Sequence, residues 1–322
     1  MSTDDVTRPW YLLPVRIDDA SQPIDELTEY LRSVARYCSV LVVDGSPPPV
    51  FDRNRRAWAP IAGHVAPAPA LRSRNGKAHG VNTGMRQVTG DLVIIADDDV
   101  RYTREGIEAV VAALAEADVV VPQNHFTPLP WHAVWDSART LVNRSFAMDY
   151  PGTLGVRRAA FAAVGGYDGD VLFENLELIR TMLAAGRAVR SAPHVLVARR
   201  PPTARHFLGQ RVRQAYDSFA QPGRLAVELA VLPVVVGAVL TGRWWVAVGV
   251  AGLVTGVAER GRRRWGGRTV FPARTALAAP LWTTERAVCA WLAVGARLRG
   301  GVWYRDGRLR VAANSIRRLR GR

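Results

Sequence analysis

The stretch DLVIIADDDV, residues 91–100, places five apolar residues directly before three consecutive aspartates. A short apolar run bounded by polar residues is typical of a buried strand. Three adjacent carboxylates at the end of such a strand repel one another unless a cation or hydrogen-bond donors lie beside them. A divalent cation is the simplest partner, and oxygen-only ligands favour Mg²⁺ or Mn²⁺. The stretch therefore predicts a strand with a metal-binding acidic end, although an acidic surface turn would show the same pattern.

Short apolar runs and helix-period segments alternate on both sides of this stretch. The other predicted strands are 10–16, 39–44, 64–68 and 118–122, and the predicted helices are 24–36, 76–88 and a segment from Thr103, as N-cap, to Ala117. This alternation predicts an α/β fold with a mainly parallel sheet. Open parallel sheets bind ligands beyond the carboxyl ends of their strands. Asp44, which ends the strand 39–44, is therefore a second candidate site residue.

Six motifs occur in an order that is more specific than any one of them. They are VVDGS (42–46), RNGKAHGVNTGM (74–85), DLVIIADDDV (91–100), VGGYDGD (164–170), FENLEL (173–178) and QRVR (210–213). The set resembles the inverting family 2 glycosyltransferases of the membrane-associated bacterial type, whose nucleotide-sugar-binding fold is called GT-A. The resemblance covers roughly residues 10–220.

The resemblance implies roles for residues on the donor side of the site. Asp44 would contact the base or ribose of the nucleotide, and Lys77 would face the nucleotide or its phosphates. Asp97 and Asp99 would be the outer carboxylates of the metal motif, with Asp99 the better direct ligand. Asp98 would face the sugar.

The acceptor side departs from the family pattern. The proton-accepting Asp of the family motif is replaced here by Asn175, which cannot accept a proton at neutral pH. Glu174, or else Glu177 three residues on, would have to serve as the base, or the protein is inactive. Gln210 and Arg213 match the Gln-x-x-Arg element that precedes the membrane segments of membrane-bound members, and Arg213 would stabilise the leaving diphosphate.

The excess of positive charge in this chain lies in its C-terminal third. Lys and Arg number 43 and Asp and Glu number 28, a formal net charge of +15. The apolar stretch 225–258 is interrupted by Gly242 and Arg243, which favours a short membrane hairpin. The basic run RGRRRWGGR, 260–268, follows it and indicates that this end of the hairpin lies on the cytoplasmic side of the membrane. A buried pair of soluble helices is the alternative. The segment 275–298 is predicted as an amphipathic interfacial helix.

The sequence thus predicts a GT-A catalytic domain (1–220), a transmembrane helical hairpin (221–260) and a basic interfacial tail (261–322). The predicted function is metal-dependent inverting transfer of a hexose from a nucleotide-sugar donor to a lipid or glycolipid acceptor, at the cytoplasmic face of the cell membrane. The alternatives are a sugar nucleotidyltransferase and an inactive membrane-bound nucleotide-sugar-binding protein. No aromatic and basic platform for nucleic acid is present, so no nucleic-acid partner is expected.

Overall fold

The computed structural model describes residues 8–147, 149, 152–304 and 307–321. They form two compact units. The α/β unit comprises residues 1–124, 150–198 and 314–322, and the helical unit comprises 125–149 and 199–313. These units differ from the predicted segments 1–220, 221–260 and 261–322, because the chain leaves the α/β unit twice and returns to it each time.

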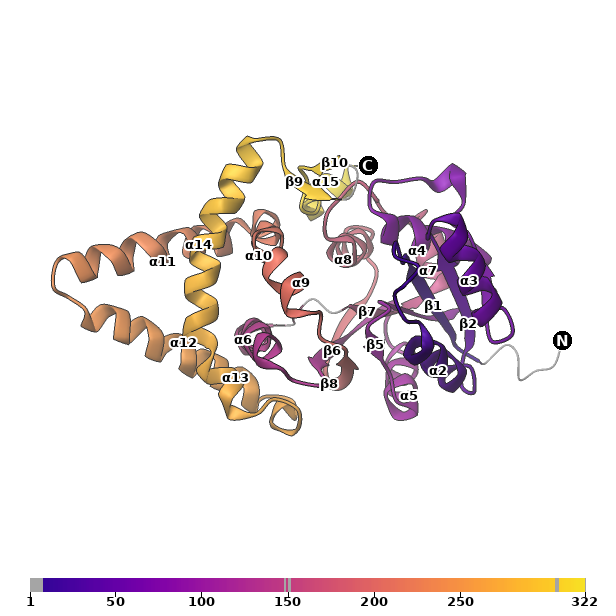
Figure 1. The fold of residues 1–322 in the computed structure, drawn as a ribbon, viewed down its shortest axis with the longest axis horizontal. Helices are drawn as coiled ribbons and strands as arrows, with labels where there is room; N and C mark the ends of the chain where they lie inside the picture. Colours follow the sequence, from indigo (N-terminus) through magenta and orange to yellow (C-terminus); the bar gives the residue numbers. More distant parts are fainter. Residues whose placement is uncertain (1–7, 148, 150–151, 305–306, 322) are drawn as a thin grey trace. The chain divides into compact units, whose positions relative to one another are not determined.

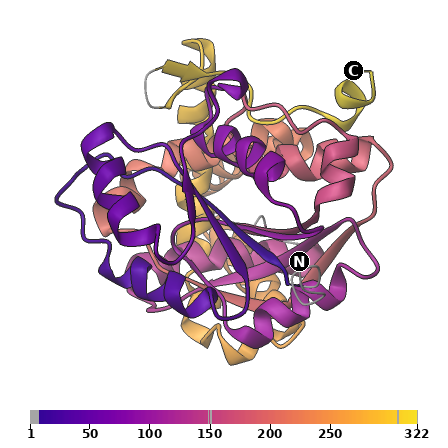
Figure 2. The ribbon, with the colours of Figure 1, turned by 90° about the vertical axis from the view of Figure 1, so that its right-hand side faces the viewer.

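Eight strands of the described residues form one sheet in the order β3-β2-β1-β4-β7-β6-β8-β5. The strands are β1 (Trp10–Val15), β2 (Ser39–Asp44), β3 (Gly63–Val65), β4 (Leu92–Ala96), β5 (Val100–Arg101), β6 (Val119–Phe126), β7 (Thr153–Arg157) and β8 (Val189–Arg199). The pairs β1–β2, β2–β3 and β1–β4 are parallel, and β7 runs antiparallel to β4 and β6. Each predicted strand is present, but β3 covers only the first two residues of the predicted strand 64–68. Figure 2 shows the first strands, in indigo, twisted against one another.

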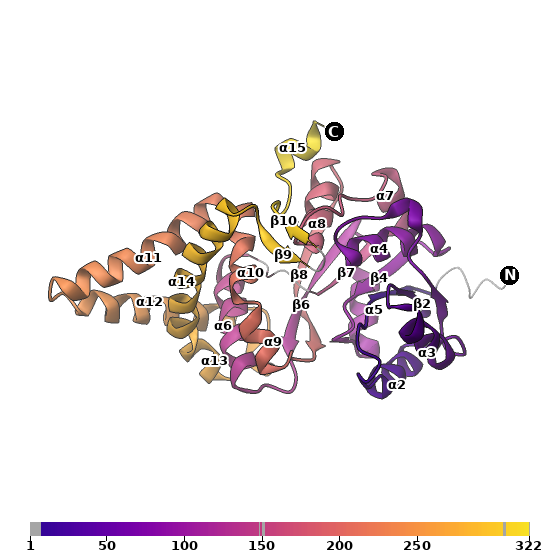
Figure 3. The ribbon, with the colours of Figure 1, turned by 45° about the horizontal axis from the view of Figure 1, so that its top comes forward.

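Helices cover both faces of this sheet. They are α2 (Asp25–Val34), α3 (Pro48–Trp58), α4 (Gly76–Gln87), α5 (Arg104–Ala113), α7 (Arg158–Ala163) and α8 (Glu174–Ala184). The short helix α15 (Ile316–Arg320) packs against α8. Side chains alternate along β1: Tyr11 and Leu13 enter the core shared with α2, α3 and α5. Leu12 faces α4, where a Cβ on Gly84 would lie 2.2 Å from it. Figure 3 shows α4 on one side of these strands and α2 and α3 on the other.

The helical unit is built around one long helix. Its elements are α6 (Trp131–Phe146), α9 (Ala204–Gly209), α10 (Arg211–Ala215), α11 (Pro222–Leu240), α12 (Trp245–Arg263), α13 (Ala273–Leu277), α14 (Ala279–Leu298) and the strand pair β9 (Val302–Tyr304) and β10 (Gly307–Leu309). Helix α14 packs against α6, α10, α11 and α12, and Figure 1 shows it, in yellow, crossing the hairpin.

Helices α11 and α12 form the helical hairpin expected from the sequence. They are joined at Gly242, whose φ of +72° is favourable for glycine. Trp244 and Trp245 at the turn are 66% and 62% exposed. Among the described residues only α11 is long and apolar enough to cross a membrane, and 6% of its apolar window is buried. The two helices are longer than the apolar stretch 225–258 suggests, since α12 continues into the basic run.

The segment 275–298 is helical but divides into α13 and α14 near Ala278. One face of α14 is buried, including Trp282, Arg286 and Cys289, whereas Leu281 and Trp291 on the other side are about half exposed. The predicted amphipathic helix is present, and it also supplies core to the helical unit. Its position at a membrane interface stays a prediction.

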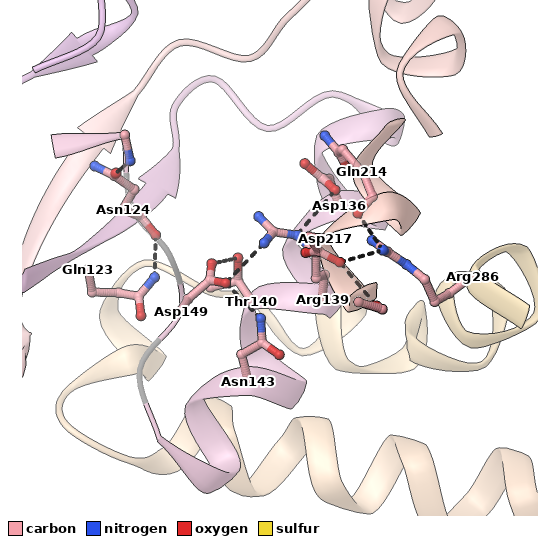
Figure 4. A network of polar contacts seen from close by, with 12 residues as sticks. Gln123, Asn124, Asp136, Arg139, Thr140, Asn143, Asp149, Gln214, Asp217 and Arg286 are labelled. Carbon is pink, nitrogen blue, oxygen red and sulfur yellow. Dashed lines mark hydrogen bonds and ion pairs between the residues drawn. The ribbon is translucent and has the colours of Figure 1, made fainter. Parts of the chain in front are cut away.

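Buried ion pairs hold the helical unit together (Figure 4). Asp149 accepts hydrogen bonds from Arg139, Thr140 and Asn143 at 2.7–3.0 Å. Arg286 of α14 is 1% exposed and donates to the Gln214 carbonyl and to the Asp217 carboxylate. Because a buried charge is costly unless it is paired, these contacts fix how α6, α10 and α14 pack.

Candidate functional site

The acidic end of β4 forms a tight turn. The Asp97 backbone N–H donates to Gly152 at 2.8 Å, and the Val100 N–H donates to the Asp97 carbonyl at 3.1 Å before β5 begins. Asp97 and Asp99 are partly buried, and Asp98 is exposed. The register pairs Leu12 of β1 with Ile95 of β4, and Val15 of β1 with Asp44 of β2. The acids at the ends of β2 and β4 therefore lie on the same carboxyl edge of the sheet.

Lys77 places a positive charge beside the acids at this edge of the sheet. It sits in the first turn of α4, where the Asn75 side chain caps the helix by accepting from the Lys77 and Ala78 backbone N–H groups. Its Nζ forms ion pairs with Asp97 and, at 2.9 Å, with Glu174, and it donates to Asn175 Oδ1 at 3.2 Å. Burial alone would lower the pKa of Lys77, but the two carboxylates outweigh burial and raise it above its usual range. Lys77 thus stays charged and joins the acidic turn to α8.

Glu174 opens helix α8 and is the candidate base. Its side chain is 15% exposed, one oxygen pairs with Lys77, and the other accepts from Asn75 Nδ2 at 3.2 Å. Burial would raise the pKa of Glu174, but Lys77 and these hydrogen bonds lower it below its ordinary value. The carboxylate is therefore ionised at neutral pH, in the state that can accept a proton.

Glu177 lies one turn further along α8 and is not exposed. Its two oxygens accept from the backbone N–H and the side-chain amide of Asn314, at 2.6 and 2.7 Å. These contacts join α8 to residue 314, so Glu177 has a structural role in the α/β unit. Its role as an alternative base stays a prediction.

Asp44 is enclosed rather than open to a ligand. The residue is 1% exposed, and its carboxylate accepts from the Ser46 N–H at 2.8 Å, from Asn54 Nδ2 at 2.8 Å and from His64 Nε2 at 3.1 Å. Burial would raise the pKa of Asp44, but the hydrogen bonds from His64, Ser46 and Asn54 lower it. The carboxylate ties β2 to α3 and β3, and contact with a nucleotide stays a prediction for this residue.

Gln210 and Arg213 belong to the helical unit, not to the α/β unit that carries the other candidates. Gln210 lies between α9 and α10 and contacts His206, one helical turn before it. The Arg213 guanidinium lies over the Tyr304 ring, 4.7 Å from its centre. A role for both residues in the reaction stays a prediction.

The residues at the end of β4 fit a hard divalent cation by their donor chemistry. Mg²⁺ and Mn²⁺ are commonly bound by one or two carboxylates with substrate phosphates and water completing the shell. Asp97 and Asp99 supply two such carboxylates on one turn. No group of three or more His, Cys, Asp or Glu side chains in the described part of the chain is arranged to hold a metal by itself. A metal here would depend on phosphate oxygens for its remaining ligands.

Comparison with known proteins agrees with this architecture. Residues 23–161, which contain the acidic turn, match the family described as Glycosyl transferase family 2. These residues form a family 2 glycosyltransferase domain. The match extends from the start of α2 to within α7 and leaves Glu174 beyond its end. No curated protein matches the chain.

Two solved structures are among those similar to this chain. The mannosyltransferase PcManGT from Pyrobaculum calidifontis, in complex with GDP-Man and Mn²⁺, has a TM-score of 0.53 at 19% identity, covering 88% of this chain and 86% of that chain. Glucosyl-3-phosphoglycerate synthase from Mycobacterium tuberculosis, in complex with Mn²⁺, UDP-Glc and phosphoglyceric acid, has a TM-score of 0.46 at 17% identity, covering 66% and 78%. At this identity the likeness to PcManGT concerns the fold, which is of the GT-A type.

Three residues of the α/β unit were missed by sequence reasoning. They are Asn75, His64 and Asn314, and each holds a candidate acid in place. Asn75 stands directly before a helix and could have been found as an N-cap. His64 and Asn314 carry no local signal, because their partners lie 20 and 137 residues away.

Proposed function

We propose that this protein transfers a sugar from a nucleotide-sugar donor to an acceptor hydroxyl, with inversion at the anomeric carbon. The observation that carries the proposal is the Asp97, Lys77 and Glu174 cluster, at the carboxyl edge of the sheet of a family 2 glycosyltransferase domain. It joins an acidic turn suited to a metal with a partly buried carboxylate suited to a base.

The donor would bind over the acidic turn. Asp97 and Asp99 would hold Mg²⁺ or Mn²⁺, which when bound supplies positive charge to the donor diphosphate. PcManGT was solved with GDP-Man and Mn²⁺, which supports the choice of a nucleotide sugar and a divalent ion. Lys77 would turn from Asp97 and Glu174 toward the phosphates, since a diphosphate offers it another anionic partner. Arg213 and Gln210 would assist on the leaving-group side, and Asp98 would face the sugar.

Glu174 would accept the proton of the acceptor hydroxyl as that oxygen attacks the anomeric carbon. An inverting transfer needs a carboxylate opposite the leaving group. The pairing with Lys77 keeps Glu174 ionised but weakens it as a base, because the ammonium group stabilises the charge that protonation removes. A shift of Lys77 toward the donor phosphates would restore that basicity.

The acceptor is proposed to be a lipid or glycolipid reached from the cytoplasmic face of the cell membrane. The supporting features are the apolar helix α11, the exposed Trp244 and Trp245 at the hairpin turn, and the basic run that follows within and after α12. These features would anchor the protein where lipid-borne hydroxyl groups are available.

The test is sugar transfer by Glu174→Gln, which keeps size and removes basicity. We expect turnover to fall by about 10²- to 10⁴-fold, as is typical when a general base is lost, with donor nucleotide affinity retained. Asn175→Asp added to this variant should recover part of the activity, because it supplies a carboxylate one residue away that also faces Lys77. Full activity of the Glu174→Gln variant would show that Glu174 is not the base. No transfer or donor hydrolysis by the unaltered chain with any nucleotide sugar would favour an inactive binding protein.

A further inference from the structure

Asn314 is bound to the α/β unit through its backbone N–H, its backbone carbonyl and its side-chain NH₂ group. Asn314 is 3% exposed. The backbone N–H and the side-chain amide donate to Glu177, the amide also donates to Asp168 at 3.1 Å, and the backbone carbonyl accepts from Arg180 at 3.0 Å. The short helix α15 that follows packs against α8. One asparagine thus joins α8 to the loop that precedes it.

A second buried asparagine holds the same segment from its other side. Asn75 Nδ2 donates to the Val171 and Leu172 carbonyls and to Glu174 Oε2, and the Asn75 N–H donates to the Gly169 carbonyl. Residues 168–177 are therefore fixed between the N-cap of α4 and residue 314. Asn75 binds Glu174, and Asn314 binds Glu177 and Asp168. Glu174 and Glu177 are three residues apart and share one face of α8.

We propose that Asn314 is a positioning residue that sets the place of Glu174 through α8. The inference rests on the proposed function, in which Glu174 is the base. Glu177 is fully buried, and a buried carboxylate that loses a donor is destabilised by its desolvation. Without the amide, the first turn of α8 must move to bring Glu177 to water, and Glu174 moves with it. A displacement of about 1 Å at a reacting group costs on the order of 10² in rate.

Asn314→Asp in the full chain tests this directly. The substitution keeps the shape of the side chain and replaces the donating amide with a carboxylate facing Asp168 and Glu177. We expect kcat to fall by about 10²-fold with the donor KM unchanged, and amide hydrogen exchange to accelerate over residues 167–184. The matched control is Arg320→Gln, which changes the net charge equally at an exposed position of α15 and should leave both measurements unaltered.

The second variant, Asn314→Asp with Glu177→Gln, exchanges the amide and the carboxylate across the contact. Recovery of both exchange protection and kcat supports the positioning role, and it also shows that any loss in the single variant is not general misfolding. Normal protection and kcat in Asn314→Asp would overturn the proposal. Recovered protection without recovered kcat would also overturn it, because Glu177 would then be the base. If the unaltered chain transfers no sugar, the proposed function fails, while the exchange data still decide whether residue 314 holds α8.

Discussion

At the scale of single residues, one lysine serves two acids. Lys77 is the only lysine in the chain, and its buried ammonium group neutralises both Asp97 and Glu174. The two carboxylates come from different parts of the sequence and would repel each other without it. Lys77 is therefore required for the stability of the site as well as for any contact with phosphate.

Lys77→Met should lower the free energy of unfolding by about 3–5 kcal/mol at neutral pH, the usual cost of leaving buried ion-pair partners uncompensated. The pKa of Glu174 is lowered in the fold, so its pairing stabilises the protein above the pKa of the unfolded chain and this contribution is lost as pH falls through the folded pKa. The pKa of Lys77 is raised, so its contribution persists up to alkaline pH.

The difference between the Lys77→Met variant and the unaltered chain should thus shrink as the pH falls below the ordinary Glu pKa of about 4.3. Urea unfolding measured from about pH 2 to pH 8, which spans the ordinary pKa of Glu and the lowered pKa of Glu174, checks this. Arg86→Met, at an exposed position of the same helix, is the control and should change stability by less than about 0.5 kcal/mol. Equal effects of the two substitutions would contradict the buried cluster.

Asp99→Asn should weaken binding of UDP or GDP in the presence of Mn²⁺, because it removes one of two carboxylates available to the metal. EDTA should have a similar effect on the unaltered chain and little further effect on the variant. Titration calorimetry with each nucleotide measures both, with Glu108→Gln on the exposed side of α5 as the control. Nucleotide affinity that is indifferent to EDTA and to Asp99→Asn would remove the metal from the proposal.

At the scale of elements, glycines mark where helices approach closely. A Cβ on Gly261 of α12 would lie 1.9 Å from the Leu141 carbonyl oxygen of α6, whereas a Cβ on Gly256 of the same helix would meet nothing within 4 Å. The obstacle at Gly261 is backbone, which cannot turn aside as a side chain can. The pairing of α6 with α12 therefore depends on this glycine.

Gly261→Ala should destabilise the helical unit by about 1–3 kcal/mol, the range for overpacking. Gly256→Ala, its matched control, should raise stability by about 0.5–1 kcal/mol, because alanine loses less backbone entropy than glycine in a helix. Thermal unfolding of both variants in the same detergent or buffer makes the comparison. A stabilised Gly261→Ala variant would mean that α6 and α12 do not pack as described.

The elements also show which parts of the architecture sequence reasoning reaches. Strands such as β2 and β4, and the helix capped by Thr103, follow from local apolar runs and a local cap, so their positions were predicted within a few residues. The burial of Asp44 could not be predicted, because its partner His64 belongs to another strand and the contact between them leaves no periodic pattern in the sequence. The place of Glu177 was likewise missed, since its donor comes from the far end of the sequence. Contacts between distant residues depend on tertiary packing, which a local pattern does not encode.

At the scale of the whole molecule, the helical unit exposes many apolar side chains, a pattern typical of proteins that bind membranes or other proteins. Val227, Leu240, Trp244, Trp245 and Leu253 of the hairpin and its turn are each more than 60% exposed. Exposed apolar patches of this kind mark sites of protein or membrane interaction. Together with the arginines at the end of α12 they suit an anionic lipid surface.

The full chain should sediment with membranes and resist extraction by high salt, because apolar burial is insensitive to charge screening. Trp244→Ser with Trp245→Ser should weaken binding to vesicles that contain anionic lipid, whereas Trp303→Ser, an exposed tryptophan of β9, should not. If the protein is monodisperse without detergent and does not bind vesicles, the exposed apolar side chains of α11 and α12 are instead expected to be buried in a protein assembly.

The α/β unit is not one continuous length of chain, since residues 314–321 complete it after the whole helical unit has intervened. During synthesis on the ribosome, the carboxylate of Glu177 therefore emerges well before the amide that binds it, and α11 and α12 emerge in between. The α/β unit cannot reach its final packing until those helices have been made. A nascent chain would therefore complete α11 and α12 before residue 314 reaches α8, so the final packing of α8 is a later step of folding than the formation of the hairpin.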